Sequence, residues 1–188
     1  MGDLAGLQGI LGNQAGIWLH RGDVDRALPL LVEQERLCRD LDDTSGLASS
    51  LSHQALVLKA QGDLDGALRL GEEAERLCRR ARDMAGLAAC LGNQAVILHA
   101  KGDLERALLI HHEQERICRS LGNLSGLAGC LANVALLVLR AGVPTQAAVV
   151  VKEAESYAER SSDRLVQKQV RRVAALVSEE LRLRGEDA

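Results

Sequence analysis

Aromatic side chains, prolines and long apolar runs are nearly missing from this sequence of 188 residues. Phenylalanine is absent, and the aromatic residues are limited to Trp18 and Tyr157. Surfaces that bind single-stranded nucleic acid stack bases on aromatic faces, so this scarcity argues against that class of partner. The net charge is only −3 and both signs are interspersed, which also argues against binding to nucleic acid or to an anionic membrane.

No apolar stretch reaches the length of a membrane-spanning helix, and the start Met1-Gly-Asp lacks the basic and apolar segments of a signal peptide. The cysteine count is odd, and no cluster of cysteine and histidine has the spacing of a zinc site. We therefore expect a cytoplasmic protein with no cofactor, no metal and no membrane association. The cysteines should be reduced, buried and small packing residues: they are Cys38, Cys78, Cys90, Cys118 and Cys130.

An internal repeat dominates the chain. Shifting the sequence by about 40 residues superimposes glycines, alanines and cysteines at matching places, and a fixed period of this length is the signature of a stacked repeat protein. The pattern predicts four repeats at about 4–43, 44–83, 84–123 and 124–161. The clearest matches are Gly6, Gly46, Gly86 and Gly126, then Gly22, Gly62, Gly102 and Gly142, then Ala27, Ala67, Ala107 and Ala147.

Each repeat divides into two helical halves. In residues 86–101, apolar side chains recur at the spacing of one helix face, and Gly102-Asp103 then supplies a helix end followed by a helix cap. The helices that open the four repeats, and the last helix, are expected to be capped by Asp3, Asp43, Asp83, Asn123 with Ser125, and Asp163. Helix pairs of this kind must stack on one another to bury their apolar faces.

Charge separates the two halves. The first helices carry almost no charge, whereas the second helices carry acidic and basic residues four positions apart, with the glutamate on the favourable N-terminal side. We therefore expect the first helices inside and the second helices outside. The predicted pairs are Glu35–Arg39, Glu75–Arg79 and Glu115–Arg119.

Residues 162–188 leave the repeat pattern. An apolar stripe that includes Val170, Val173 and Val177 predicts a helix that caps the fourth repeat, which we prefer to a basic helix that binds a membrane surface or a partner. The N-terminus shows no matching cap. This asymmetry suggests a fragment of a longer array, or a design derived from one.

The recurring small residues and glycine turns resemble tetratricopeptide repeats (TPRs), over residues 4–160. The period is longer than the common 34 residues of this family. The long form, with Leu-Gly-Asn at 11–13 and 91–93, is similar to the repeats of Leu-Gly-Asn spindle scaffolds, kinesin light chains and bacterial signalling ATPases. The resemblance implies an all-α, right-handed α-solenoid of four helix hairpins plus the capping helix. It also implies a module that binds a peptide or helix of another protein in a concave groove lined by the first helices, as part of a larger scaffold or signalling protein.

One ladder of polar residues fits that groove. Asn13 lies about 200° around its helix from the packing residue Leu11, and His53, Asn93 and Asn133 hold the same place in the other repeats. An amide can pair with both groups of a peptide unit, and related repeats use an asparagine in this way. The alternative is that these side chains bond neighbouring helices. The rest of the predicted groove comprises Lys59, Val96, His99, Leu136, Leu139 and Arg140, with an apolar anchor near Val96, Leu136 and Leu139.

Other functions are less favoured. The glycines at 6, 9, 12 and 16 follow no strand and precede no Lys-Ser/Thr, which favours close helix packing over a phosphate-binding loop. The residues His111-His112-Glu113 lack zincin spacing, and we expect no enzyme. Two alternatives to peptide binding remain open: self-assembly into dimers or filaments through the uncapped N-terminal face, and a designed array without a natural ligand. Irregular positions such as Gly71, His53 and Pro29 argue against the latter.

Overall fold

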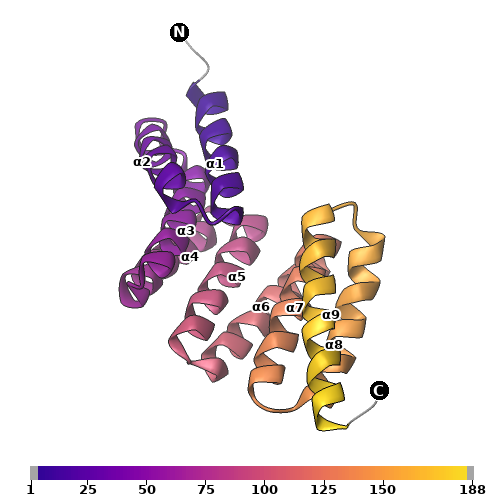
Figure 1. Cartoon of the computed structure of the whole chain (residues 1–188). Coiled ribbons are helices and arrows are strands. Elements are labelled where there is room, and N and C mark those ends of the chain that lie inside the picture. The colour runs from indigo at the N-terminus through magenta and orange to yellow at the C-terminus, as the bar shows by residue number, and fades with distance from the viewer. Residues whose placement is uncertain (1–3, 186–188) are drawn as a thin grey trace. The chain divides into compact units, whose positions relative to one another are not determined.

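The computed structural model describes residues 4–185, apart from the side chain of residue 5. Within that range the chain forms nine α-helices and no strand, and the helices follow one another through short turns (Figure 1). The predicted all-α architecture of helix hairpins is confirmed. The helices are α1 (Leu4–His20), α2 (Val24–Asp40), α3 (Thr44–Gln61), α4 (Leu64–Ala81), α5 (Met84–Lys101), α6 (Leu104–Leu121), α7 (Leu124–Arg140), α8 (Pro144–Arg160) and α9 (Arg164–Arg184).

The helix ends form as the sequence predicts. Asp43 and Asp83 accept hydrogen bonds from the backbone N–H groups of Gly46 and Gly86, at 2.9 and 2.8 Å. Asp163 caps α9 in the same manner. Gly62 ends α3 with φ of +91°, a left-handed conformation that costs little without a β-carbon. The expected cap Asp3 lies outside the described residues.

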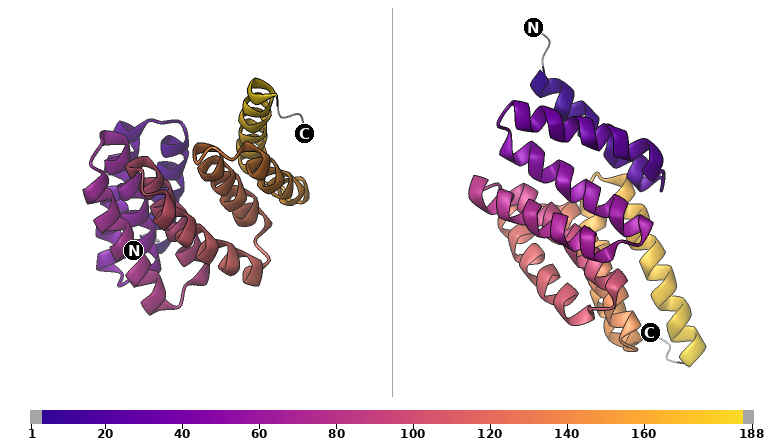
Figure 2. Two further views of the ribbon diagram at one scale, coloured as in Figure 1. Left: turned by 90° about the horizontal axis from the view of Figure 1, so that it is seen from below. Right: turned by 90° about the vertical axis from the view of Figure 1, so that its left-hand side faces the viewer.

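The chain divides into two compact units, residues 1–103 and 104–188. The division falls between α5 and α6, inside the predicted third repeat, and the proposed repeat boundaries stay a prediction. In the first unit, α1 packs on α2, α2 on α3, α3 on α4 and α4 on α5, and the inner helices α1, α3 and α5 also contact one another in order (Figure 2). A small apolar cluster at its start contains Ala15, Leu31 and Val57.

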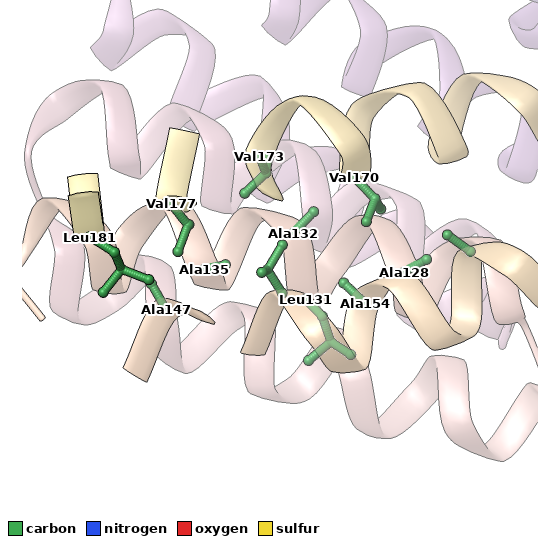
Figure 3. Packing of buried hydrophobic residues seen from close by; sticks show 12 residues of the cluster. Ala128, Leu131, Ala132, Ala135, Ala147, Ala154, Val170, Val173, Val177 and Leu181 are labelled. Atoms are coloured by element: carbon green, nitrogen blue, oxygen red, sulfur yellow. The ribbon is translucent and has the colours of Figure 1, made fainter. Parts of the chain in front are cut away.

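The second unit contains α6 to α9. Its core is built by α7, α8 and α9, and Figure 3 shows Val170, Val173 and Val177 of α9 pointing toward alanines of the neighbouring helices. Ala132 on α7 and Ala154 on α8 are 0% exposed, so the backbones approach closely. The predicted capping helix therefore packs on both α7 and α8.

The outer helices carry the ion pairs expected from the sequence. Glu35 binds Arg39 at 2.7 Å, Glu75 binds Arg79 at 2.8 Å, and Glu115 binds Arg119 at 2.6 Å. The arginines are about half exposed, so each pair contributes roughly 0.3–0.5 kcal/mol. The carboxylates of Glu35 and Glu75 also accept hydrogen bonds from glutamines of the next inner helix.

Candidate functional site

A shallow hollow lies on the inner helices of the first unit. It has a volume of about 90 Å³ and is formed by α3 and α5. Most of the lining residues are small, and most carry a polar group: Ser45, Ser49, Ser52, His53, Asp83, Gly86, Ala89, Cys90 and Asn93. Two residues of the predicted ladder, His53 and Asn93, therefore come together here.

Asn93 is held in place by the neighbouring helix. Its Nδ2 donates to the Ser52 hydroxyl at 3.0 Å, from α5 to α3. This contact matches the alternative foreseen for the ladder, in which an amide bonds an adjacent helix. It also fixes the orientation of the amide at the edge of the hollow, using one of its N–H groups.

His53 is the least satisfied polar side chain of the hollow. It is half-buried, and its Nδ1 is buried without a hydrogen-bond partner. Burial, and to a lesser extent the charge of His20, lowers the pKa of His53. The ring is therefore neutral at pH 7 and offers a hydrogen-bonding nitrogen rather than a cation. A buried polar atom without a partner is uncommon in folded proteins, which distinguishes His53 from the other lining residues.

The other predicted groove residues of the first unit have varied surroundings. Asn13 is exposed on α1, and a β-carbon added at Gly9 or Gly16 would meet nothing within 4 Å. Lys59, Val96 and His99 are half-buried on α3 and α5. This surface is open at α1 and becomes more enclosed at α5.

In the second unit, the predicted groove residues contact the capping helix. Asn133 accepts a hydrogen bond from Gln169 Nε2 at 3.1 Å, and Leu136 and Leu139 pack against the cluster that α9 completes. Arg140 is exposed. The predicted Leu136–Leu139 anchor is therefore partly buried against the core of the second unit.

Sequence reasoning missed part of the hollow. Ser45 precedes Ser49 by one helical turn, and Gly86 precedes Asn93 by two turns, so a longer reading of the same face would have found them. Cys90 was read only as a packing residue. It is 2% exposed, with its sulfur 3.7 Å from that of Cys78.

The side chains that line the hollow can donate and accept hydrogen bonds. Within residues 4–185 no group of three or more histidine, cysteine, aspartate or glutamate side chains is placed to hold a metal ion. The five cysteines are buried and unbridged. The hydrogen bond with Cys78 lowers the pKa of Cys90, the thiol that lines the hollow, but this side chain is only 2% exposed. In the same range, no helix is long and apolar enough to cross a membrane.

A second hollow, of about 270 Å³, lies between α8 and α9. It is lined by both charges and by apolar residues: Glu155, Ala158, Glu159, Gln167, Val170 and Arg171. Gln167 crosses it to donate to the backbone oxygen of Ser161 at 2.8 Å. This hollow is part of the junction that seats α9.

No protein-family model matches the sequence, and no curated protein matches it. Solved structures do match. The crystal structure of BtubC (BKLC) from P. vanneervenii has a TM-score of 0.75 and 19% identity, covering 97% of this chain and 75% of that one. The putative kinesin light chain nearly identical TPR-like repeats of Podosopora anserina match with a TM-score of 0.68 and 15% identity, covering 99% of this chain and 92% of that one. A singly substituted form of the latter protein matches equally well, with a TM-score of 0.68 and 14% identity, covering 99% of this chain and 91% of that one.

At these identities the likeness concerns the fold. The chain has the helical-repeat fold of these TPR-like proteins, which is the fold that the resemblance of its recurring glycines and alanines implied.

Proposed function

We propose that the chain is a non-catalytic protein-interaction module that binds an extended peptide segment on the inner helices of its first unit. The fold supports the general role, since TPR-like repeats present an extended inner surface to partner proteins. The hollow between α3 and α5 supports the finer assignment. The buried Nδ1 of His53, which has no partner in the folded chain, is the observation that carries it.

The chemistry of the hollow favours a peptide backbone over a charged ligand. Its lining offers serine hydroxyls, one amide and a neutral imidazole, whereas its one carboxylate, Asp83, is already engaged in capping α5 through Gly86. Hydroxyl and amide groups can pair with both the N–H and the C=O of a peptide unit. In this proposal Asn93 contributes its oxygen to a peptide N–H. The His53 ring turns so that Nδ1, which is buried in the unbound protein, bonds to the peptide.

The bound residue must be small or flat at this point. Ala89 is exposed at the hollow, and the lining also includes three serines and Gly86. These side chains are small, so the peptide backbone can approach the helices closely. An apolar residue of the peptide would then contact Val96, which is half-buried one turn beyond Asn93 along α5.

Panning of a random peptide library against the parent protein tests this function. An Ala89→Arg variant fills the hollow from an exposed position, and Ala175→Arg places the same change on an exposed site of α9 as the matched control. We expect peptides enriched by the parent to lose at least about tenfold in affinity with Ala89→Arg and to be unaffected by Ala175→Arg. Unchanged thermal melts show that both variants fold.

The Asn93→Ala and His53→Phe variants then test the named groups. Each should weaken an enriched peptide by several-fold, since each removes one hydrogen bond of about 1 kcal/mol. Peptides that bind the parent and Ala89→Arg equally well would show that the hollow is not the site.

A further inference from the structure

An apolar stripe lies exposed along α1. Its residues are Leu7, Ile10, Gln14 and Ile17, spaced by three, four and three positions, which places them on one face of the helix. Leu7 is 41% exposed, Ile10 55% and Ile17 53%, and Gln14 is exposed among them. We call these four residues the α1 stripe.

The same stripe is covered in the other inner helices. The positions one, two and three repeats later are buried in α5 and α7, and buried or half-buried in α3. They are Leu47, Ser50, Gln54 and Val57 in α3, Leu87, Cys90, Gln94 and Ile97 in α5, and Leu127, Cys130, Val134 and Leu137 in α7. Ile17 in particular corresponds to Val57, which is 1% exposed, and to Ile97, which is 0% exposed.

In each case the cover is the preceding outer helix of the same unit: α2 covers α3, α4 covers α5, and α6 covers α7. The same kind of hydrogen bond, from a glutamine to a glutamate, occurs in two of these contacts. Gln54 Nε2 donates to Glu35 Oε2 at 2.7 Å, and Gln94 Nε2 donates to Glu75 Oε2 at 2.9 Å. Gln14 holds the same register in α1.

We propose that the α1 stripe is a docking surface for an amphipathic helix of a partner protein that carries a glutamate opposite Gln14. The covering helices define what such a helix needs. Around the glutamate, α2 has Leu31 four residues before it and Cys38 three residues after it, and α4 has Gly71 and Cys78 at those places. The partner helix therefore presents a small or apolar residue, then glutamate four positions on, then a small residue after three more.

A second copy of this chain fits less well. The outer helices α2, α4 and α6 already use the corresponding face against α3, α5 and α7, and α8 uses it against α9. Glu35 and Glu75 are likewise engaged by Gln54 and Gln94. The described part of a second copy therefore has no free helix of the required pattern. The docked helix would also lie against a different face from the hollow between α3 and α5.

The covering helix α4 supplies the probe. We would use a blocked, labelled peptide with the sequence of residues 64–81, kept reduced and closed by a hydrocarbon staple at positions 72 and 76. Glu72 and Arg76 are exposed on α4, so the staple stays off the docking face. The staple holds the helix together, because an isolated helix of this length is marginal in water.

Binding would be measured by fluorescence anisotropy with the parent and three variants. Gln14→Ala removes the amide, and Ile17→Arg places a charge in the stripe. Leu109→Arg makes the same kind of change at a 64% exposed leucine of α6 and is the matched control. All three positions are exposed, and thermal melts check that each variant folds.

We expect saturable binding that Gln14→Ala weakens by about tenfold, the loss of one charge-assisted hydrogen bond. Ile17→Arg should abolish binding, and Leu109→Arg should leave it unchanged. A peptide with Glu75→Ala should bind the parent protein as weakly as the unchanged peptide binds the Gln14→Ala protein. The Glu75→Ala peptide should bind the Gln14→Ala protein with no further loss of affinity.

Three results would overturn the proposal. The first is no saturable binding up to about 1 mM peptide. The second is equal binding by the parent and Ile17→Arg, which would place the peptide elsewhere. The third is a parent mass that doubles with concentration and returns to that of a monomer with Ile17→Arg, which would assign the stripe to a second copy.

Discussion

Replacing Gln94 with leucine examines what joins α4 to α5. Gln94 is 3% exposed, and its Nε2 donates to the Gly71 carbonyl oxygen at 2.8 Å and to Glu75 Oε2 at 2.9 Å. Leucine nearly preserves the volume but removes both bonds. The charge-assisted bond contributes about 1.5–3 kcal/mol and the neutral one about 1 kcal/mol. Burial of the new apolar atoms offsets about 1–2 kcal/mol of this loss.

We therefore expect Gln94→Leu to lower the free energy of unfolding by about 2 kcal/mol. Gln54→Leu is the matched control, since Gln54 occupies the same place in α3 but is only half-buried. It donates to Glu35 at 2.7 Å and to Ser50 at 3.4 Å, and water can replace part of this bonding. Its loss should cost about 1 kcal/mol or less.

Urea denaturation followed by far-ultraviolet circular dichroism measures both values. A double-mutant cycle with Glu75→Ala then isolates the Gln94–Glu75 term, which should exceed about 1 kcal/mol. If Gln94→Leu were as stable as the parent, or Gln54→Leu were the more damaging change, the buried amide would not be what joins these helices.

Three more changes have defined outcomes. Ala107→Glu should cost more than about 2 kcal/mol in urea denaturation, because the alanine is 0% exposed and the new carboxylate would have no partner; a melt within a degree or two of the parent would contradict the packing. Val177→Ala should cost about 2 kcal/mol, because the valine is 1% exposed between α9 and its neighbours, whereas the exposed Leu176→Ala should cost little. Burial, and then the charges of Asp43 and Glu35, raise the pKa of Cys38 to about 11, so its stabilising contribution is complete below about pH 9 and is lost as the pH rises toward 11. Across that window the parent should lose stability more steeply than Cys38→Ala, and identical pH profiles would count against this account.

The helices and their ends followed from local rules. Asp43 and Asp83 cap helices because a short carboxylate reaches the first free backbone N–H groups, whatever packs nearby. Gly62 and Gly102 end helices at positive φ, a conformation that other residues adopt at a cost. The ion pairs between residues four apart, such as Glu75–Arg79, depend on helix geometry alone.

Some irregular positions became understandable only in pairs. Gly71, one of the irregular positions, lies against Gln94, and a β-carbon there would come within 2.8 Å of Gln94 Cγ. Gln34 packs over Gly12 in a similar exchange. Each large residue is accommodated by a glycine on the facing helix, a compensation that no single position reveals.

For the polar ladder, the sequence predicts the positions of the side chains but not their surroundings. Its register places Asn13, His53, Asn93 and Asn133 at equivalent points, and the helix period is sufficient to derive that. Their surroundings differ: Asn13 is exposed, His53 has a buried nitrogen without a partner, Asn93 bonds Ser52, and Asn133 bonds Gln169. Each of these outcomes depends on which helix lies opposite.

The sequence by itself thus determined the helices, their caps and their order, because these depend on contacts within a few residues along the chain. Tertiary structure decided the hollow at His53, the partial burial of Leu136 and Leu139 against the core of the second unit, and the exposure of Ile10 and Ile17 on α1. Burial and hydrogen-bond satisfaction are properties of pairs of helices. Side chains that the repeat makes equivalent can therefore be core residues in one helix and open surface in another.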